Sequence, residues 1–214
     1  MIFGCAKDEP YAWHKGVPFE SILAQSGEKL VLMDFETEWW GWCKRLDADT
    51  FSDSKVKSFA NQNLISMKID AEKGEGIELA KQFSIRGFPT IVFANEKGEE
   101  IDRIVGYMPP EPFLKELNRI QSGKNTLPAL LEDFQQNPSK FSTLFKLAKK
   151  YESMDDPGSA KRMVNAILAE GTDSAGTAEF FSILYDARET RDPIPLIAYA
   201  DKNPDSENST VALE

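Results

Sequence analysis

The sequence predicts an α/β protein in which helices flank a mixed central sheet and an all-helical region follows. Three observations support this prediction. Residues 30–35 form an apolar run of strand length without polar alternation, which is typical of strands buried on both faces of a parallel sheet. Residues 95–98 have the composition of a hairpin turn between two further strands. From residue 127 onward only helical periodicity remains.

Strands and helices alternate along the first half of the chain. Apolar residues at Phe19, Ile22 and Leu23 predict a short amphipathic helix before Gly27. Strands are expected at 30–35, 64–70, 90–94 and 100–105, and helices at 41–48, 52–62, 77–83 and 111–121. The inward residues of the third of these helices are expected to be Ile77, Leu79, Ala80 and Phe83. The order implies right-handed parallel crossovers followed by an antiparallel pair.

Changes in composition divide the chain into four parts. These are an N-terminal arm (1–16), the α/β domain (17–122), a helical region (126–204) and a polar tail (205–214). The expected C-terminal helices cover 127–136, 139–152, 157–170, 175–190 and 194–202. Two helix pairs follow one another at roughly 34 residues, which resembles the tetratricopeptide period. A small helical appendage packed on the first domain is the alternative.

Composition excludes several classes of function. The chain has 214 residues and a net charge of −10, which argues against nucleic acid as a partner. It contains no apolar run of the roughly 20 residues that span a membrane. Two cysteines and one histidine provide neither a disulfide framework nor an ordinary zinc site, so we expect no metal and no cofactor.

The residues before Cys5 resemble the end of a bacterial lipoprotein signal, in which Cys5 would carry the lipid anchor. The alternative is an unremarkable cysteine on a chain terminus. On this basis we expect a periplasmic or membrane-anchored lipoprotein rather than a cytoplasmic protein.

One motif carries the functional argument. It reads Asp-Phe-Glu-Thr-Glu-Trp-Trp-Gly-Trp-Cys-Lys over residues 34–44, with Arg-Gly-Phe-Pro-Thr at 86–90 and Gly106 further on. This resembles the thioredoxin family over residues 13–120, and most of all the branch with a Trp-Cys-Gly-Trp-Cys-Lys motif. Many members of that branch are secreted or periplasmic. The resemblance implies the thioredoxin fold and thiol–disulfide oxidoreductase activity in cell redox homeostasis.

The resemblance also assigns roles to single residues. Trp40 occupies the place of the attacking cysteine, Cys43 that of the resolving cysteine, and Asp34 that of a buried carboxylate. Pro89 matches the family's cis-proline, which presents backbone to a polypeptide substrate. The expected binding residues around it are Trp39, Gly41, Trp42, Phe88 and Thr90.

The replacement of the first cysteine by Trp40 leaves a degenerate CxxC motif. An indole forms no thiolate and no mixed disulfide, so we expect dithiol exchange to be lost. Cys43 is expected to be buried beneath Trp40 and inert, and Trp39 to be structural. The three indoles either pack together and close the site or bind a partner.

Three functional hypotheses follow from this motif. The first is a redox-inactive, polypeptide-binding or chaperone-like module. The second is a disulfide oxidoreductase whose Trp40 is a variant or engineered replacement of the catalytic cysteine. The third is a scaffold in which the helical repeat makes the interactions. Whether the chain is an enzyme therefore depends on position 40.

Overall fold

The computed structural model describes residues 9–170, 177–190 and 194–202. Contacts divide the chain into two units, residues 1–126 and 127–214. Cys5 and the polar tail at 205–214 lie outside the described residues, so the lipid-anchor expectation stays a prediction. Among the described residues, none of the helices has the length and apolarity needed to cross a membrane.

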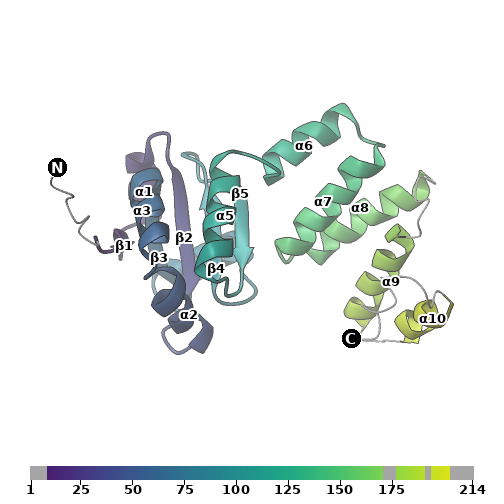
Figure 1. Cartoon of the computed structure of the whole chain (residues 1–214), viewed down its shortest axis with the longest axis horizontal. Helices are drawn as coiled ribbons and strands as arrows, with labels where there is room; N and C mark the ends of the chain where they lie inside the picture. Colours follow the sequence, from purple (N-terminus) through teal and green to yellow (C-terminus); the bar gives the residue numbers. More distant parts are fainter. Residues whose placement is uncertain (1–8, 171–176, 191–193, 203–214) are drawn as a thin grey trace, which may run out of the picture. The chain divides into compact units, whose positions relative to one another are not determined.

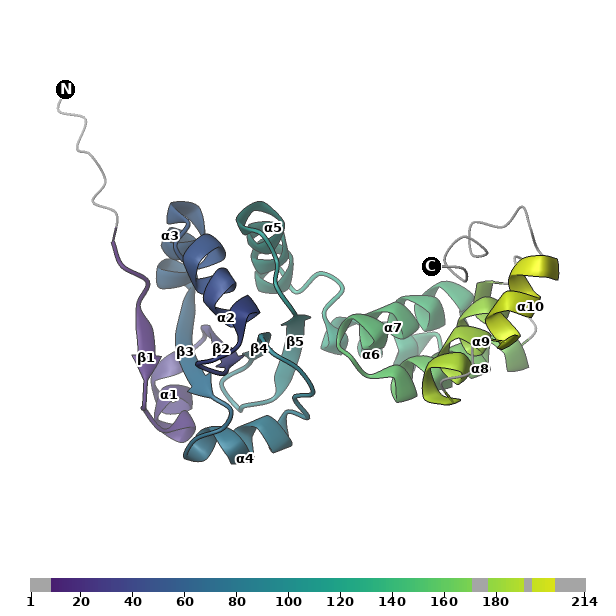
Figure 2. The ribbon, with the colours of Figure 1, turned by 90° about the horizontal axis from the view of Figure 1, so that it is seen from below.

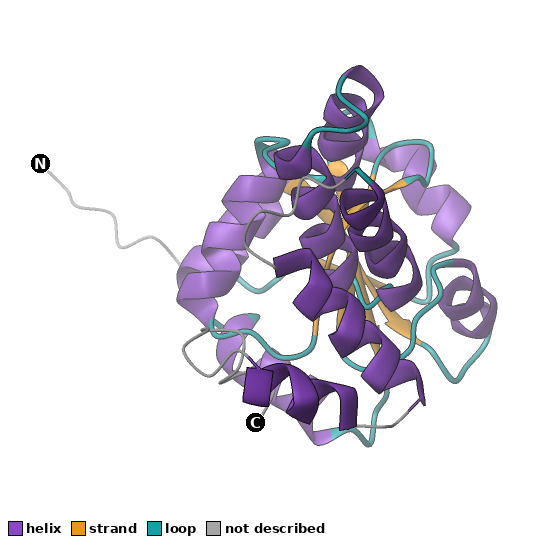
Figure 3. Cartoon of the chain, turned by 90° about the vertical axis from the view of Figure 1, so that its right-hand side faces the viewer, coloured by secondary structure: helices purple, strands orange, loops and turns teal. Residues whose placement is uncertain are grey.

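The first unit contains one five-stranded sheet in the order β1-β3-β2-β4-β5 (Figures 1 and 3). Its strands are β1 (Trp13–Lys15), β2 (Leu30–Glu36), β3 (Leu64–Asp70), β4 (Thr90–Ala94) and β5 (Glu100–Val105). Strands β1 and β2 both pair in parallel with β3, whereas β4 runs antiparallel to β2 and to β5. The mixed sheet predicted from the sequence is thus confirmed.

Helices cover both faces of this sheet, as Figure 2 shows. They are α1 (Phe19–Ser26), α2 (Gly41–Arg45), the π-helical turn η1 (Leu46–Thr50), α3 (Ser54–Asn63), α4 (Glu75–Gln82) and α5 (Pro110–Gln121). Consecutive residues of β2 point to opposite faces of the sheet and so enter different cores. Leu32 packs with the residues of η1, α3 and α5, whereas Met33 packs with those of α1 and α4. The apolar run of β2, which only Asp34 interrupts before Glu36, follows from the strand's central place, because both of its faces are covered.

Three local details differ from the sequence prediction. Residues 13–15, expected in the arm, form the edge strand β1, in which Trp13 pairs with Ser66. The helix expected over 41–48 is α-helical only to Arg45 and continues as a π-turn. Ile77, expected to point inward, is 40% exposed, because the buried face of α4 runs through Gly76 and Leu79 and leaves Ile77 at its side.

Gly76 lies where α4 crosses the end of β3, and the close approach leaves no room for a side chain. A Cβ atom at this position would lie 2.0 Å from the carbonyl oxygen of Asp70. Gly76→Ala is therefore expected to lower the free energy of unfolding by about 1–3 kcal/mol or more, as overpacking does. Urea denaturation measures the change, and Gly87→Ala, whose Cβ would meet no atom within 4 Å, is the matched control. Equal stability of the two variants would contradict the close approach of Gly76 to the Asp70 carbonyl oxygen.

The second unit has only helices as regular secondary structure in the part of it that the structure describes. Its helices are α6 (Leu127–Gln136), α7 (Phe141–Ser153), α8 (Pro157–Ala169), α9 (Thr177–Thr190) and α10 (Ile194–Lys202). Each helix packs against the next one along the chain. They share a core that includes Leu144, Val164, Ile167, Phe180 and Leu184. The helical character is as predicted, and the tetratricopeptide interpretation stays a prediction.

Candidate functional site

The site is built where β2 ends and α2 begins. Trp40 has an extended backbone (φ −78°, ψ 121°) and is the N-cap residue of α2. Its carbonyl oxygen accepts a hydrogen bond from the Lys44 backbone N–H at 3.3 Å. Cys43 lies within this helix and is buried, with only 3% of its surface exposed. The residue at the helix N-terminus is therefore an indole, and the thiol is one turn further inside.

The segment that contains Pro89 lies at the same end of the sheet. The Phe88–Pro89 peptide bond is cis, and the Gly106 backbone N–H donates to the Pro89 carbonyl oxygen at 2.8 Å. Thr90 begins β4 opposite Phe35, which is near the end of β2. Because residues 37–40 continue from that end of β2, the cis-proline and the start of α2 belong to one region of the molecule.

The three indoles of the motif do not close the site. Trp39, Trp40 and Trp42 are 62%, 39% and 48% exposed. Trp39 and Trp40 contact each other edge to face, with ring centroids 5.4 Å apart. Trp39 also donates its indole N–H to Glu72 at 2.9 Å. Trp39 is thus held by a hydrogen bond and is also the most exposed of the three, and the expectation that it is a structural residue stays a prediction.

Trp42 belongs to a second exposed group. Its ring lies 5.7 Å from that of Tyr107, and the Arg45 guanidinium stacks over both rings, at 5.5 Å and 4.8 Å. Asp49 accepts hydrogen bonds from the Arg45 Nε at 3.2 Å and the Tyr107 hydroxyl at 3.0 Å. This group thus contains its own cation, held over aromatic rings.

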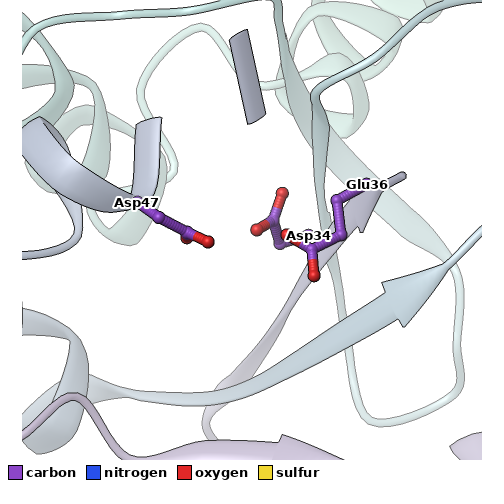
Figure 4. A group of neighbouring side chains, drawn as sticks. All are labelled: Asp34, Glu36 and Asp47. Atoms are coloured by element: carbon purple, nitrogen blue, oxygen red, sulfur yellow. The ribbon is translucent and has the colours of Figure 1, made fainter. Parts of the chain in front are cut away.

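Beneath α2 lies a buried charge cluster that the sequence did not predict. The Lys68 ammonium group contacts carboxylate oxygens of Asp34 at 2.8 Å, Glu36 at 2.6 Å and Asp47 at 2.7 Å. The Lys68 side chain is 6% exposed and that of Asp34 is 2% exposed. Figure 4 shows the three carboxylates converging, two of them from β2 and Asp47 from η1.

The three carboxylates of this cluster are close enough together to be candidate metal ligands. One oxygen each from Asp34, Glu36 and Asp47 lies within 4.8 Å of the others, which is a spacing that a cation could bridge. The Lys68 ammonium group already makes an ion pair with all three carboxylates. The chain therefore supplies the compensating positive charge itself.

Burial shifts the ionisation of the groups in this region. It raises the pKa of Asp34 from 3.8 to about 6, although Lys68 acts in the opposite direction. Burial alone would lower the pKa of Lys68, but its contacts with Asp34 and the other carboxylates raise it above the ordinary value. Burial also raises the pKa of the Cys43 thiol, against the effect of a hydrogen bond with the Thr37 backbone. The pKa of Cys43 is thus shifted in the opposite direction from that of activated cysteines.

The raised pKa of Asp34 predicts a pH-dependent stability. The folded state binds the proton of the Asp34 carboxyl more tightly than the unfolded state does. Protonation of Asp34 therefore stabilises the fold fully below about pH 4, and this stabilisation is lost as the pH rises through about 6. The free energy of unfolding of the wild type, minus that of Asp34→Asn, is expected to fall by on the order of 2–3 kcal/mol over this range. Urea denaturation at both ends of the range measures it. If the difference in free energy of unfolding between wild type and Asp34→Asn does not change with pH, the pKa of Asp34 is not raised.

Sequence reasoning missed Lys68, Glu36, Asp47 and Glu72 as members of the site. One signal was available for Lys68, which interrupts an otherwise apolar stretch of β3 between Met67 and Ile69. A lysine on a strand buried in a sheet needs an acidic partner. In the parallel register Lys68 lies directly opposite Asp34. The three other missed residues, Glu36, Asp47 and Glu72, lie at positions without such a pattern.

The strand order, the cis-proline and the position of α2 after β2 together define a domain with the thioredoxin fold. Residues 20–121 match the family model described as a thioredoxin-like domain. This part of the chain is thus a thioredoxin-like domain.

Relatives and solved structures are similar to the same part of the chain. The thiol:disulfide interchange protein DsbD of Yersinia pestis is 37% identical over 101 residues, which are 46% of this chain and 17% of that protein. The DsbD of Pasteurella multocida is 30% identical over 106 residues, or 48% and 18% of the two chains. A thioredoxin from Thermus thermophilus, solved in solution, covers 52% of this chain and 88% of that one, at 27% identity and a TM-score of 0.46. The chain thus spans less than a fifth of the length of these DsbD relatives.

Proposed function

We propose that this chain is a thioredoxin-like protein that has lost thiol–disulfide exchange and binds polypeptide at the surface around Trp39, Trp40 and Trp42. The observation that carries the proposal is Trp40 itself, which caps α2 at the place implied for the attacking thiol. An indole at that place provides a large apolar contact surface instead of a nucleophile.

Cys43 does not replace the missing thiol in this proposal. It is buried, its pKa is raised by burial, and it is the only cysteine in the part of the chain that the structure describes. A single inaccessible thiol neither attacks a substrate disulfide nor closes an internal one. The resolving role implied for Cys43 therefore has no partner in the described residues.

The aromatic surface supports the binding half of the proposal. Three exposed indoles lie within four residues, at the end of the sheet that also contains the cis-Pro89 segment. Clustered exposed aromatic side chains are typical of sites that bind proteins or peptides. The helical unit from residue 127 onward offers a second contact surface for the same partner.

Two measurements test the two halves of the proposal. In an insulin-reduction assay with dithiothreitol, the protein is expected to give no rate above the buffer. Turnover that persists after Cys5→Ser would show that Cys43 alone supports exchange, and the alternative of an active oxidoreductase would then hold. For binding, the fluorescence anisotropy of a labelled extended peptide is expected to rise with the wild type. The rise is expected to fall when Trp39 and Trp40 are both changed to alanine.

A further inference from the structure

We propose that the Trp39–Trp40 half of this surface accepts a basic side chain, so that the partner is an extended polypeptide segment that carries an arginine. The inference rests on the proposed polypeptide-binding function and names the chemistry of the partner. Carboxylates surround the two indoles of this half. The other half, here called the Trp42 half, comprises Trp42, Tyr107, Arg45 and Asp49.

The Trp42 half of the surface already binds a cation, which is the guanidinium group of Arg45. The Arg45 guanidinium lies over the rings of Trp42 and Tyr107, and Asp49 accepts a hydrogen bond from it. Two aromatic faces and one carboxylate thus hold a guanidinium group that belongs to the chain itself. Such stacking is favourable because the positive charge meets the negative face of the ring.

The Trp39–Trp40 half has the aromatic rings and the carboxylates without the arginine. Glu72 accepts a hydrogen bond from the Trp39 indole, and Glu38 directly precedes Trp39 in the chain. Glu38 is 78% exposed and pairs with Lys73, which also pairs with Asp70. Within the residues that the structure describes, cations stack over Trp13, Trp42, Phe51, Tyr107 and Phe181 but over neither Trp39 nor Trp40.

A cavity that Glu38 lines, but Trp39, Trp40 and Glu72 do not, has one more carboxylate than lysine. Its volume is about 460 Å³, and it lies between the ends of the parallel strands and the start of α4. Glu36, Glu38, Asp70 and Glu75 line it together with Lys15, Lys68 and Lys73. Lys68 pairs with Glu36, and Lys73 is shared between Glu38 and Asp70. The side chain of an arginine fits this volume with room to spare, and its charge complements the surplus of carboxylates.

The test compares two forms of one short, extended, labelled peptide, with either arginine or neutral citrulline at its centre. With the full-length protein at low ionic strength, we expect the arginine form to bind about tenfold more tightly. The double variant Glu38→Gln and Glu72→Gln is expected to remove most of this preference, measured as the ratio of the affinities for the two peptides. Added salt is expected to reduce the preference in the wild type.

The matched control removes the same charge at the opposite end of the sheet. Glu28 precedes β2 and Glu96 follows β4, and both are exposed. The double variant Glu28→Gln and Glu96→Gln is expected to keep the wild-type preference. If it loses the preference equally, the effect is a general one of net charge and the inference fails. If wild type binds both peptides equally well, the inference fails while the proposed polypeptide binding stands; if it binds neither, both fail.

Discussion

Trp40→Cys is expected to convert this protein into a dithiol that forms a disulfide with Cys43. The new thiol would cap α2, where unpaired backbone N–H groups and the helix dipole stabilise a thiolate. We expect its pKa to lie within about 3.5–7.5, the range of activated cysteines at such positions. Cys43 follows three residues later in the same helix, so it is placed to attack a mixed disulfide.

The measurement uses a Cys5→Ser background, so that only the two motif cysteines remain. After mild oxidation the Trp40→Cys protein is expected to have no thiol that reacts with Ellman's reagent and to show the mass of an internal disulfide. After reduction it is expected to catalyse insulin reduction that the unmodified protein does not. Two free thiols after oxidation would show that the assignment of Trp40 to the nucleophile position is wrong.

Trp42→Cys in the same background is the matched control. It also replaces an exposed indole of the motif by cysteine, but it places the thiol next to Cys43 inside α2 rather than at its N-cap. Adjacent residues of a helix point in different directions, so no internal disulfide is expected. Catalysis by this variant would show that any exposed thiol in the region suffices.

Much of the fold could be predicted because the local patterns agree with the tertiary structure. The apolar run of β2 predicted a strand covered on both faces, and its alternate residues do enter two cores. The turn at 95–98 predicted the antiparallel pair of β4 and β5. The edge strand β1 was missed, because three residues with one exposed face carry too little periodicity to distinguish a strand from an arm.

The site was predictable only in part, for a related reason. The resemblance pointed to Asp34 and Pro89, and the structure has a buried carboxylate at the first and a cis peptide bond at the second. The hydrogen bond of Trp39 with Glu72 joins residues 33 positions apart, and no local pattern encodes it. Asp47 lies on η1 with 43% of its side chain exposed, and no local pattern encodes its ion pair with Lys68 on β3.

Lys68→Met is expected to destabilise the fold more than any other single change considered above. Removal of the ammonium group leaves Asp34, Glu36 and Asp47 with three oxygens within 4.8 Å and no compensating charge. Loss of one partner from a buried ion pair costs about 3–5 kcal/mol. We therefore expect the free energy of unfolding at neutral pH to fall by about that amount.

The pH dependence and a second variant separate this cause from simple loss of packing. Because protonation relieves the repulsion, the destabilisation by Lys68→Met is expected to be smaller at about pH 5 than at about pH 7. Adding Asp34→Leu to Lys68→Met is expected to recover part of the loss, since it replaces the buried charge by an apolar group. Lys81→Met, which removes an exposed lysine paired with Glu78, is expected to cost less than about 0.5 kcal/mol. If Lys68→Met costs the same at both pH values and the double variant recovers nothing, packing by the lysine stem, rather than its charge, stabilises this part of the sheet.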